Sequence, residues 1–218
     1  MTIQKYIAYL YRCITFVFIL FVSTACSHAQ EKPFLEWPIM SEQFSHYYAP
    51  ASSGVYEYYL KPEYQEKAVN FNAQEAGIPI KGHHFSDDHV STDMRYVELG
   101  SFQSGSYLYK LIAYNRSDDA DIVIFNIQLN SYNGGGQLID ALLLDSRFGF
   151  EEVQKFSEFI ISNDIVEIDY YVTQVIEIIN GGELGNAIET PIPRLEMKEK
   201  YLIDQGGVFK LIFQVQEQ

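Results

Sequence analysis

Apolar and polar residues alternate along much of the chain after residue 94. In the run 123–129, apolar residues recur at every second position: Val123, Phe125, Ile127 and Leu129. This period places them together on one face of a β-strand. The run 166–178 predicts a longer strand of the same kind, with Val166, Ile168, Tyr170, Val172, Ile176 and Ile178 on one face and Glu167, Asp169, Thr173 and Glu177 on the other. One apolar face backed by one wet face is typical of antiparallel sheet.

Eight such runs, rich in Ile, Val, Tyr and Phe, follow one another from residue 94, with turn sequences such as "NGGG", "SND" and "DQGG" between them. Short links containing glycine favour hairpins, because parallel strands need long crossovers. Only "FGFEEVQKF", residues 148–156, has the character of an intervening helical turn. We therefore predict a mainly β chain with an antiparallel domain over residues 94–218. It is either one curled sheet or meander, or a two-sheet sandwich.

Residues 30–93 have a different character, with five prolines and many Asn, Ser and His residues. We expect this segment to fold across the sheet. The run 55–60 predicts a strand, and "PEYQEKAVNF" predicts a short helix that begins at Pro62, where the missing N–H does no harm. At most one or two short helices are expected in all.

The first 25 residues have the pattern of a signal peptide. Lys5 and Arg12 precede an apolar run, 13–22, that is too short to span a bilayer. Cleavage before Cys26 would leave a cysteine for lipid attachment, and cleavage after Ala29 would give a soluble secreted form. Either cut predicts a cell-envelope protein, in the periplasm or on the outer membrane, or otherwise secreted. Neither cut leaves a cysteine pair for a disulfide.

The formal charge is −14. Removing the signal takes away two basic residues and no acid, which leaves 13 basic against 29 acidic side chains, or −16. This balance argues against nucleic acid as a partner, because phosphate neutralisation needs clustered Lys and Arg. For the same reason membrane contact is expected only through a lipid anchor. The charge suits a basic protein partner, and it also suits a chain that acid residues simply keep soluble.

The stretch "KGHHFSDDH", residues 81–89, concentrates histidine and aspartate. His83 and His89, together with Asp87 or Asp88, are residue types that bind zinc. Their spacing matches no established metal pattern, and "SDDH" is also typical of a turn or a helix N-cap. The stretch is therefore either a polar loop or the centre of a metal-dependent or hydrolytic periplasmic enzyme. The sequence assigns no catalytic residue and no cofactor, since a Gly-x-Ser-x-Gly elbow and a phosphate loop are both missing.

A second candidate is a surface of aromatic and acidic residues in the irregular segment. Tyr and Trp are favoured at interfaces, and carboxylates would face a basic ligand. The same tyrosines would serve equally well as half-buried strand residues, and a glycan-binding module is a further alternative. The residues are Trp37, Tyr47, Tyr48, Tyr56, Glu57, Tyr58, Tyr59, Glu63 and Tyr64.

Three stretches carry a resemblance to known proteins: "GQLIDALLLD", "FSEFIISNDIVEIDYYV" and "KYLIDQGGVFKLI". In strand and turn spacing, residues 137–213 resemble the C-terminal half of small bacterial envelope lipoproteins, including immunity-type proteins that protect cells from toxins. The resemblance implies a β fold and transfers no catalytic residue. With the signal and the charge, it leads us to expect a non-enzymatic envelope protein that binds another protein. A specific form of this expectation is an immunity-type inhibitor of a periplasmic toxin.

Overall fold

The computed structural model describes residues 35–51, 57–85, 87–117, 122–150, 152–179 and 183–217. The predicted signal peptide, Cys26 and Tyr56 lie outside these ranges. Within them, no helix is both long enough and apolar enough to cross a membrane.

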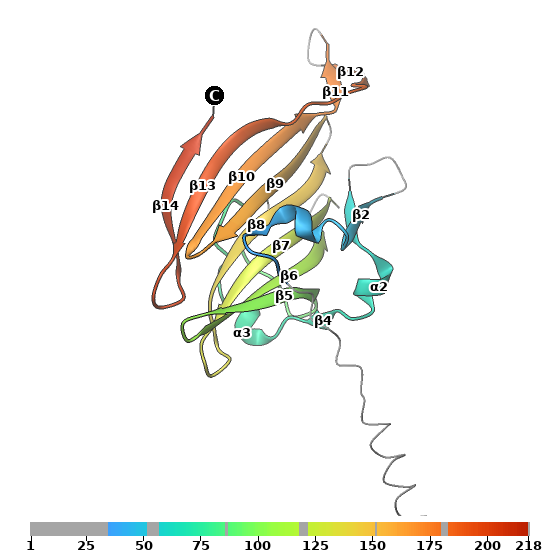
Figure 1. Ribbon diagram of the computed structural model, residues 1–218. Helices are drawn as coiled ribbons and strands as arrows, with labels where there is room; N and C mark the ends of the chain where they lie inside the picture. Colours follow the sequence, from blue (N-terminus) through green and yellow to red (C-terminus); the bar gives the residue numbers. More distant parts are fainter. Residues whose placement is uncertain are drawn as a thin grey trace, which may run out of the picture. The chain divides into compact units, whose positions relative to one another are not determined.

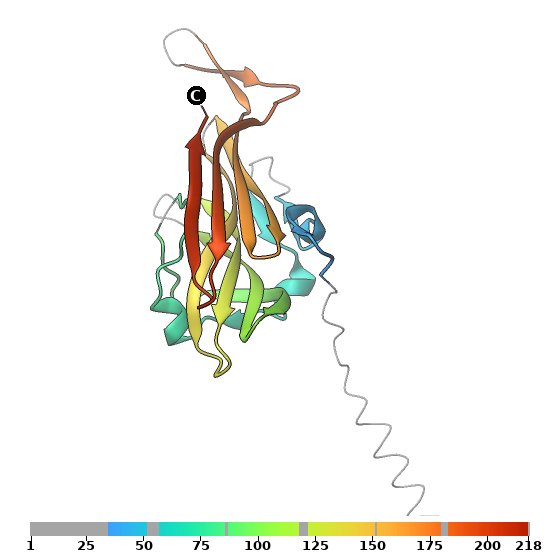
Figure 2. The ribbon, with the colours of Figure 1, turned by 60° about the vertical axis from the view of Figure 1, so that its left-hand side comes forward.

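The fold is mainly β, as predicted, and one antiparallel sheet dominates it (Figure 1). The strands from residue 95 onward are β5 (Arg95–Ser104), β6 (Tyr107–Ser117), β7 (Val123–Tyr132), β8 (Leu138–Phe150), β9 (Val153–Ser162), β10 (Ile165–Gln174), β11 (Ile176–Ile178), β12 (Leu184–Ala187), β13 (Arg194–Ile203) and β14 (Phe209–Gln216). The main sheet has the order β14-β13-β10-β9-β8-β7-β6-β5-β4, and β1 also pairs with β9. Figure 2 shows how strongly it curves. The single curled sheet, and not the two-sheet sandwich, is the correct alternative.

The described part of the irregular N-terminal segment contributes only short elements. They are β1 (Ile39–Met40), the 3-10 helix η1 (Ser41–Phe44), β2 (Tyr48–Pro50), β3 (Tyr58–Leu60), α2 (Pro62–Gln65), β4 (Val69–Asn70) and α3 (Ala73–Ala76). Helix α2 begins at Pro62 as predicted, although it is much shorter than the sequence run. Helix α3 was not predicted. A capping box between Asn72 and Glu75 starts it, and the spacing Asn-x-x-Glu was the signal available in the sequence.

The concave face of the sheet encloses an inner core. It takes Phe125, Ile127 and Leu129 from β7, which confirms the face predicted from their spacing. It also takes Phe159, Val166, Ile168, Met197 and Phe209 from β9, β10, β13 and β14. Residues Ile39, Phe44, Tyr47 and Leu60 of the N-terminal segment join the same core. The N-terminal segment therefore fills the curve of the sheet.

The opposite face of β6, β7 and β8 is buried as well, beneath residues 71–96. Phe71, Ile80 and Val90 pack there against Ile112 and Leu143. Three even-numbered residues of β7, Gln128, Asn130 and Tyr132, are linked by hydrogen bonds in a ladder on this face. Gln128 donates to Asn130 at 2.6 Å, Asn130 donates to the Tyr132 hydroxyl at 3.1 Å, and Tyr132 donates to Glu75 at 2.8 Å. The expectation that the second face of β7 is exposed to water is therefore wrong. The amide side chains on this face are buried and form hydrogen bonds with protein groups in place of water.

The predicted strand over residues 166–178 is wrong in its second half. Strand β10 ends at Gln174, and the Val175 N–H donates to the Glu152 carbonyl at 2.7 Å. The chain then leaves the sheet as the β11–β12 hairpin. Thr173, on the face predicted to be wet, is buried, whereas Ile178, on the face predicted to be apolar, is 53% exposed. The expected helical turn at 148–156 is also wrong, since β8 runs to Phe150 and β9 begins at Val153.

Strand β8 joins the two halves of the sheet. Eight residues between Leu138 and Arg147 pair with β7, and the last three, 148–150, pair with β9. Where the ladder to β9 stops, side chains take over. The buried Asp145 carboxylate accepts a hydrogen bond from the Ser157 N–H at 2.7 Å, and Arg147 donates to the Ser157 carbonyl and also pairs with Asp145.

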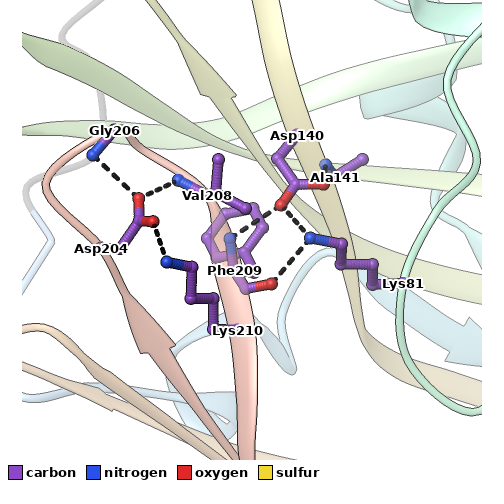
Figure 3. Close-up of polar contacts among 8 residues, drawn as sticks. All are labelled: Lys81, Asp140, Ala141, Asp204, Gly206, Val208, Phe209 and Lys210. Atoms are coloured by element: carbon purple, nitrogen blue, oxygen red, sulfur yellow. Dashed lines mark hydrogen bonds and ion pairs between the residues drawn. The ribbon is translucent and has the colours of Figure 1, made fainter.

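A second acid–base pair repeats this arrangement at the start of β14 (Figure 3). Asp140 accepts a hydrogen bond from the Phe209 N–H at 2.7 Å, and Lys81 donates to the Phe209 carbonyl at 2.7 Å. Lys81 and Asp140 also form an ion pair at 2.6 Å. In both places a carboxylate and a cation replace the carbonyl and the amide that a neighbouring strand would supply.

We expect Asp145→Ala to lower the free energy of unfolding by about 3–5 kcal/mol, because it leaves a buried guanidinium and the Ser157 N–H without an acceptor. Asp169→Ala is the matched control. It breaks an exposed ion pair with Lys198 and should cost at most about 1 kcal/mol. Urea unfolding of the two variants measures both values. Equal losses would show that the buried pair does not hold the halves together.

From the hydrogen bonds in the β13–β14 turn we expect the free energy of unfolding to fall at acid pH. Asp204 accepts hydrogen bonds from Lys210, Val208 and Gly206, and these donors, Lys210 foremost, lower its pKa to about 2. A carboxyl with a depressed folded pKa contributes stability above its unfolded pKa, near 4, and loses it as the pH falls toward 2. Asp204→Asn should therefore unfold at lower urea than wild type at pH 7. The difference should shrink as the pH falls below about 4 and vanish only below about pH 2, and a difference that persists well below pH 2 would contradict this assignment.

Candidate binding pocket

A pocket of about 120 Å³ lies where the loop 81–85 meets β8, β9, β10 and β13. Aromatic rings and polar groups line it together. The lining residues are His83, His84, Phe85, Ser146, Phe148, Lys155, Phe156, Ser157, Tyr170, Tyr171 and Glu196. Two of them, His83 and His84, belong to the histidine-rich stretch that the sequence marks out.

The loop reaches the pocket because its backbone is fixed to β8. The Lys81 N–H donates to the Ala141 carbonyl at 2.9 Å, and the Lys81 carbonyl accepts from the Leu143 N–H at 2.8 Å. Gly82 then turns the chain with φ +105, and a Cβ there would lie 3.0 Å from the Leu143 carbonyl oxygen. Glycine is required at this position, because both its dihedral angle and the space around it exclude a side chain.

Two exposed phenylalanines lie together at the pocket, Phe85 in its lining and Phe150 beside the Phe85 ring. The Phe85 ring lies 4.1 Å from the Phe148 ring and 6.2 Å from the Phe150 ring, measured between centroids. Phe85 is 43% exposed and Phe150 is 39% exposed. Exposed rings held together at the mouth of a pocket are typical of a recognition surface.

The polar groups of the pocket are mostly engaged with one another. The His83 ring packs edge-on against Tyr170, and the Tyr170 hydroxyl donates to the buried Glu199 at 2.7 Å. Burial, followed by the charge of Glu199, raises the pKa of Tyr170, so the phenol stays neutral. Lys155 and Glu196 form an ion pair at 3.0 Å, and each is about one-third exposed. The pocket therefore presents a neutral phenol whose proton is already donated to Glu199, and one balanced pair of charges.

Volume limits what the pocket can hold. Pockets for drug-sized ligands and cofactors occupy about 300–1,000 Å³. A cavity of about 150 Å³ holds a single benzene ring. The pocket therefore has the volume of one side chain or one ring.

The structure does not assemble the metal ligands considered above into a site. His84 bonds the Ile80 carbonyl at 2.7 Å, and His89 pairs with its neighbour Asp88 at 2.7 Å. The Asp87 carbonyl accepts from Arg116, and His83 lies against Tyr170. Within the described ranges no three His, Cys, Asp or Glu side chains come together as a metal would require.

The predicted aromatic–acidic patch is divided among several elements. Four of its tyrosines pack against the inner core: Tyr47, Tyr48, Tyr58 and Tyr64. The Arg147 guanidinium lies over the Tyr48 and Tyr58 rings at 5.1 and 6.0 Å. The patch residues that reach solvent are Trp37, Glu57, Tyr59 and Glu63. Tyr56 lies outside the described residues.

Sequence reasoning did not find the aromatic residues of the pocket. Phe148 and Phe150 stand two residues apart at the end of a strand, and Phe156 and Tyr171 lie opposite each other on β9 and β10. The spacing "FGF" beside a turn was the available signal. It gives no indication that a loop 63 residues earlier would place Phe85 against Phe148.

No family model, curated protein or solved structure matches this chain. The basis for a functional proposal is therefore the pocket and the charge distribution.

From the surroundings of His84 we expect the loop 81–85 to become less stable in mild acid. Burial is the main cause that lowers the pKa of His84, against the opposing contact with the Ile80 carbonyl and the charge of Asp88. A base with a lowered folded pKa contributes stability above its unfolded pKa, near 6.5, and loses it as the pH falls below that value. The protection factors of the amides of residues 82–85, which correct for the pH dependence of intrinsic exchange, should therefore fall as the pH drops from about 7.5 to 5. His84→Gln, which keeps a donor, should remove this pH dependence, and an unchanged dependence would contradict the prediction.

Proposed function

We propose that this protein is a non-catalytic binding protein of the bacterial cell envelope, and that it captures another protein at the pocket formed by the loop 81–85. The observation that carries the proposal is a pocket the size of one side chain, with the exposed Phe85 in its lining and the exposed Phe150 beside that ring. Binding energy at protein interfaces concentrates in a few such places, where an aromatic or long side chain enters a well-packed pocket.

The polar groups of the pocket suit orientation rather than catalysis. Lys155 and Glu196 already neutralise each other, and the Tyr170 hydroxyl already donates to Glu199. An incoming side chain would gain contact with the rings and would exchange hydrogen bonds with groups that are already satisfied. This chemistry supports recognition of a partner more than it supports the metal-dependent, hydrolytic or glycan-binding alternatives.

The compartment and the class of partner follow from the sequence. The signal pattern and Cys26 support secretion with a lipid anchor, and the charge of −14 supports a basic partner. The specific version of the proposal is an immunity-type inhibitor that binds a basic toxin acting in the periplasm. The resemblance of residues 137–213 to envelope lipoproteins supports the same version.

The product of any toxin gene beside this one is the first partner to test. Calorimetric titration against residues 30–218 should give a complex. Phe85→Ala and Phe150→Ala should each weaken it at least about tenfold, since a truncated hot-spot residue costs about 2 kcal/mol or more. Ile192→Ala is the matched control, because Ile192 is 79% exposed and lies outside the pocket.

Salt provides a second test of the same complex. Association between an acidic protein and a basic partner should slow as the salt concentration rises, because salt screens the attraction.

Cells that lack the gene should also lose resistance to the toxin. Unchanged resistance to every neighbouring toxin would end the immunity version, and equal binding by the Phe85 and Ile192 variants would end the role of the pocket.

A further inference from the structure

Strand β14 is an edge strand of unusual composition. It stands at one end of the sheet, and no other described strand pairs with its outer edge (Figure 1). Four of its large apolar residues are exposed, Leu211 at 48%, Ile212 at 54%, Phe213 at 45% and Val215 at 37%. Lys210 is its single charged residue, and it contains no proline. Natural proteins usually protect an edge with charges, prolines or a covering element.

The backbone of this edge is open beyond its first residue. The N–H and C=O of Phe209 point away from β13, and Asp140 and Lys81 satisfy them (Figure 3). Because backbone groups alternate in an antiparallel ladder, those of Leu211 also point outward. After the bulge opposite Lys200, the Glu217 N–H again bonds β13, at the Glu196 carbonyl. The same alternation then directs the groups of Gln214 and Gln216 outward.

We propose that this edge pairs with β14 of a second copy of the chain, so that two sheets continue across a two-fold axis. Antiparallel pairing about Gln214 would place Phe213 of one copy opposite Val215 of the other, twice. Aromatic and β-branched pairs of this kind stabilise antiparallel sheets. The pairing would also bring Lys210 of each copy to the end of its partner that carries Glu217, so that opposite charges meet at both ends.

The local charge favours a second copy over a basic partner at this edge. Strands β13 and β14 together carry four basic residues, Arg194, Lys198, Lys200 and Lys210, and two acidic ones, Glu196 and Glu199. Lys198, Lys200 and Lys210 each pair with an acid outside these two strands, namely Asp169, Glu167 and Asp204, so the edge is close to neutral on a chain whose net charge is −14. A basic strand would therefore gain no electrostatic attraction at the edge itself. Two copies repel only through their distant acidic surfaces, and salt screens that repulsion beyond about 8 Å at physiological ionic strength.

Sedimentation of residues 30–218 tests the proposal. We expect a dimer that tightens when salt rises from about 0.02 to 0.3 M, because the long-range repulsion is then screened. Phe213→Lys should raise the dimer dissociation constant at least about tenfold, because an edge lysine blocks strand pairing. Ile192→Lys, which changes another exposed apolar residue, should leave it unchanged. Circular dichroism confirms that each variant is folded.

Engineered cysteines test the register. The natural cysteines, Cys13 and Cys26, both precede residue 30, so each introduced thiol is the only one in its chain. Directly opposed antiparallel residues have Cα atoms about 4.5–5.5 Å apart, within disulfide range. A mixture of the Phe213→Cys and Val215→Cys chains should therefore form the mixed disulfide in clear excess over either homodimer.

Three results would overturn the proposal. The first is a chain that stays monomeric at about 200 µM in both salts, a concentration well above a micromolar dissociation constant. The second is a Phe213→Lys variant that associates as tightly as wild type. The third is a cysteine mixture in which the homodimers form as readily as the mixed disulfide. None of these results bears on the pocket, whose residues lie outside β14.

Discussion

The structure depends on how strand β8 is shared. One end of β8 pairs with β7 and the other with β9, so the sheet must curl where the two ladders separate. A separated ladder leaves backbone N–H and C=O groups without partners, and burying such groups costs about 1–3 kcal/mol each. Asp145 with Arg147 at Ser157, and Asp140 with Lys81 at Phe209, satisfy these groups with side chains. A buried carboxylate paired with a cation thus supplies the hydrogen bonds that a neighbouring strand would otherwise supply.

The curl has consequences on both faces. The concave side encloses one core from both halves of the sheet, together with the N-terminal segment. The other face of β7 is buried as well, so its amides form a ladder that ends at Glu75 in the capping box of α3. Polar residues at alternate positions in a strand usually indicate exposure to water. Here Gln128, Asn130 and Tyr132 bond to one another and to Glu75, which is the other way that a buried polar group avoids its desolvation cost.

The same geometry produces the two surfaces on which the proposals rest. The pocket forms where β8 crosses from one ladder to the other, because the loop that carries Lys81 continues across the gap to His83 and Phe85. The open edge forms because β14 is tied to Asp140 and Lys81 only at its first residue. A partner protein at the pocket and a second copy at the edge would use separate parts of the molecule, so one dimer could present two pockets.

The sequence by itself determined the fold class, the antiparallel pairing, most of the hairpins and the apolar face of β7. These features depend on near neighbours in the chain: the two-residue period, the turn residues and the short links between strands. The tertiary structure alone decided the rest, namely the second buried face of β7, the end of β10 at Gln174, the separation of the predicted tyrosine patch and the pocket itself. Phe85 and Phe148 lie 63 residues apart, and their contact exists because Lys81 is held to β8 and Gly82 turns the chain toward β10. Periodicity along a chain reports which side of a strand is apolar. It carries no information on what will cover that side, because the cover comes from distant segments whose placement depends on packing and on buried charges.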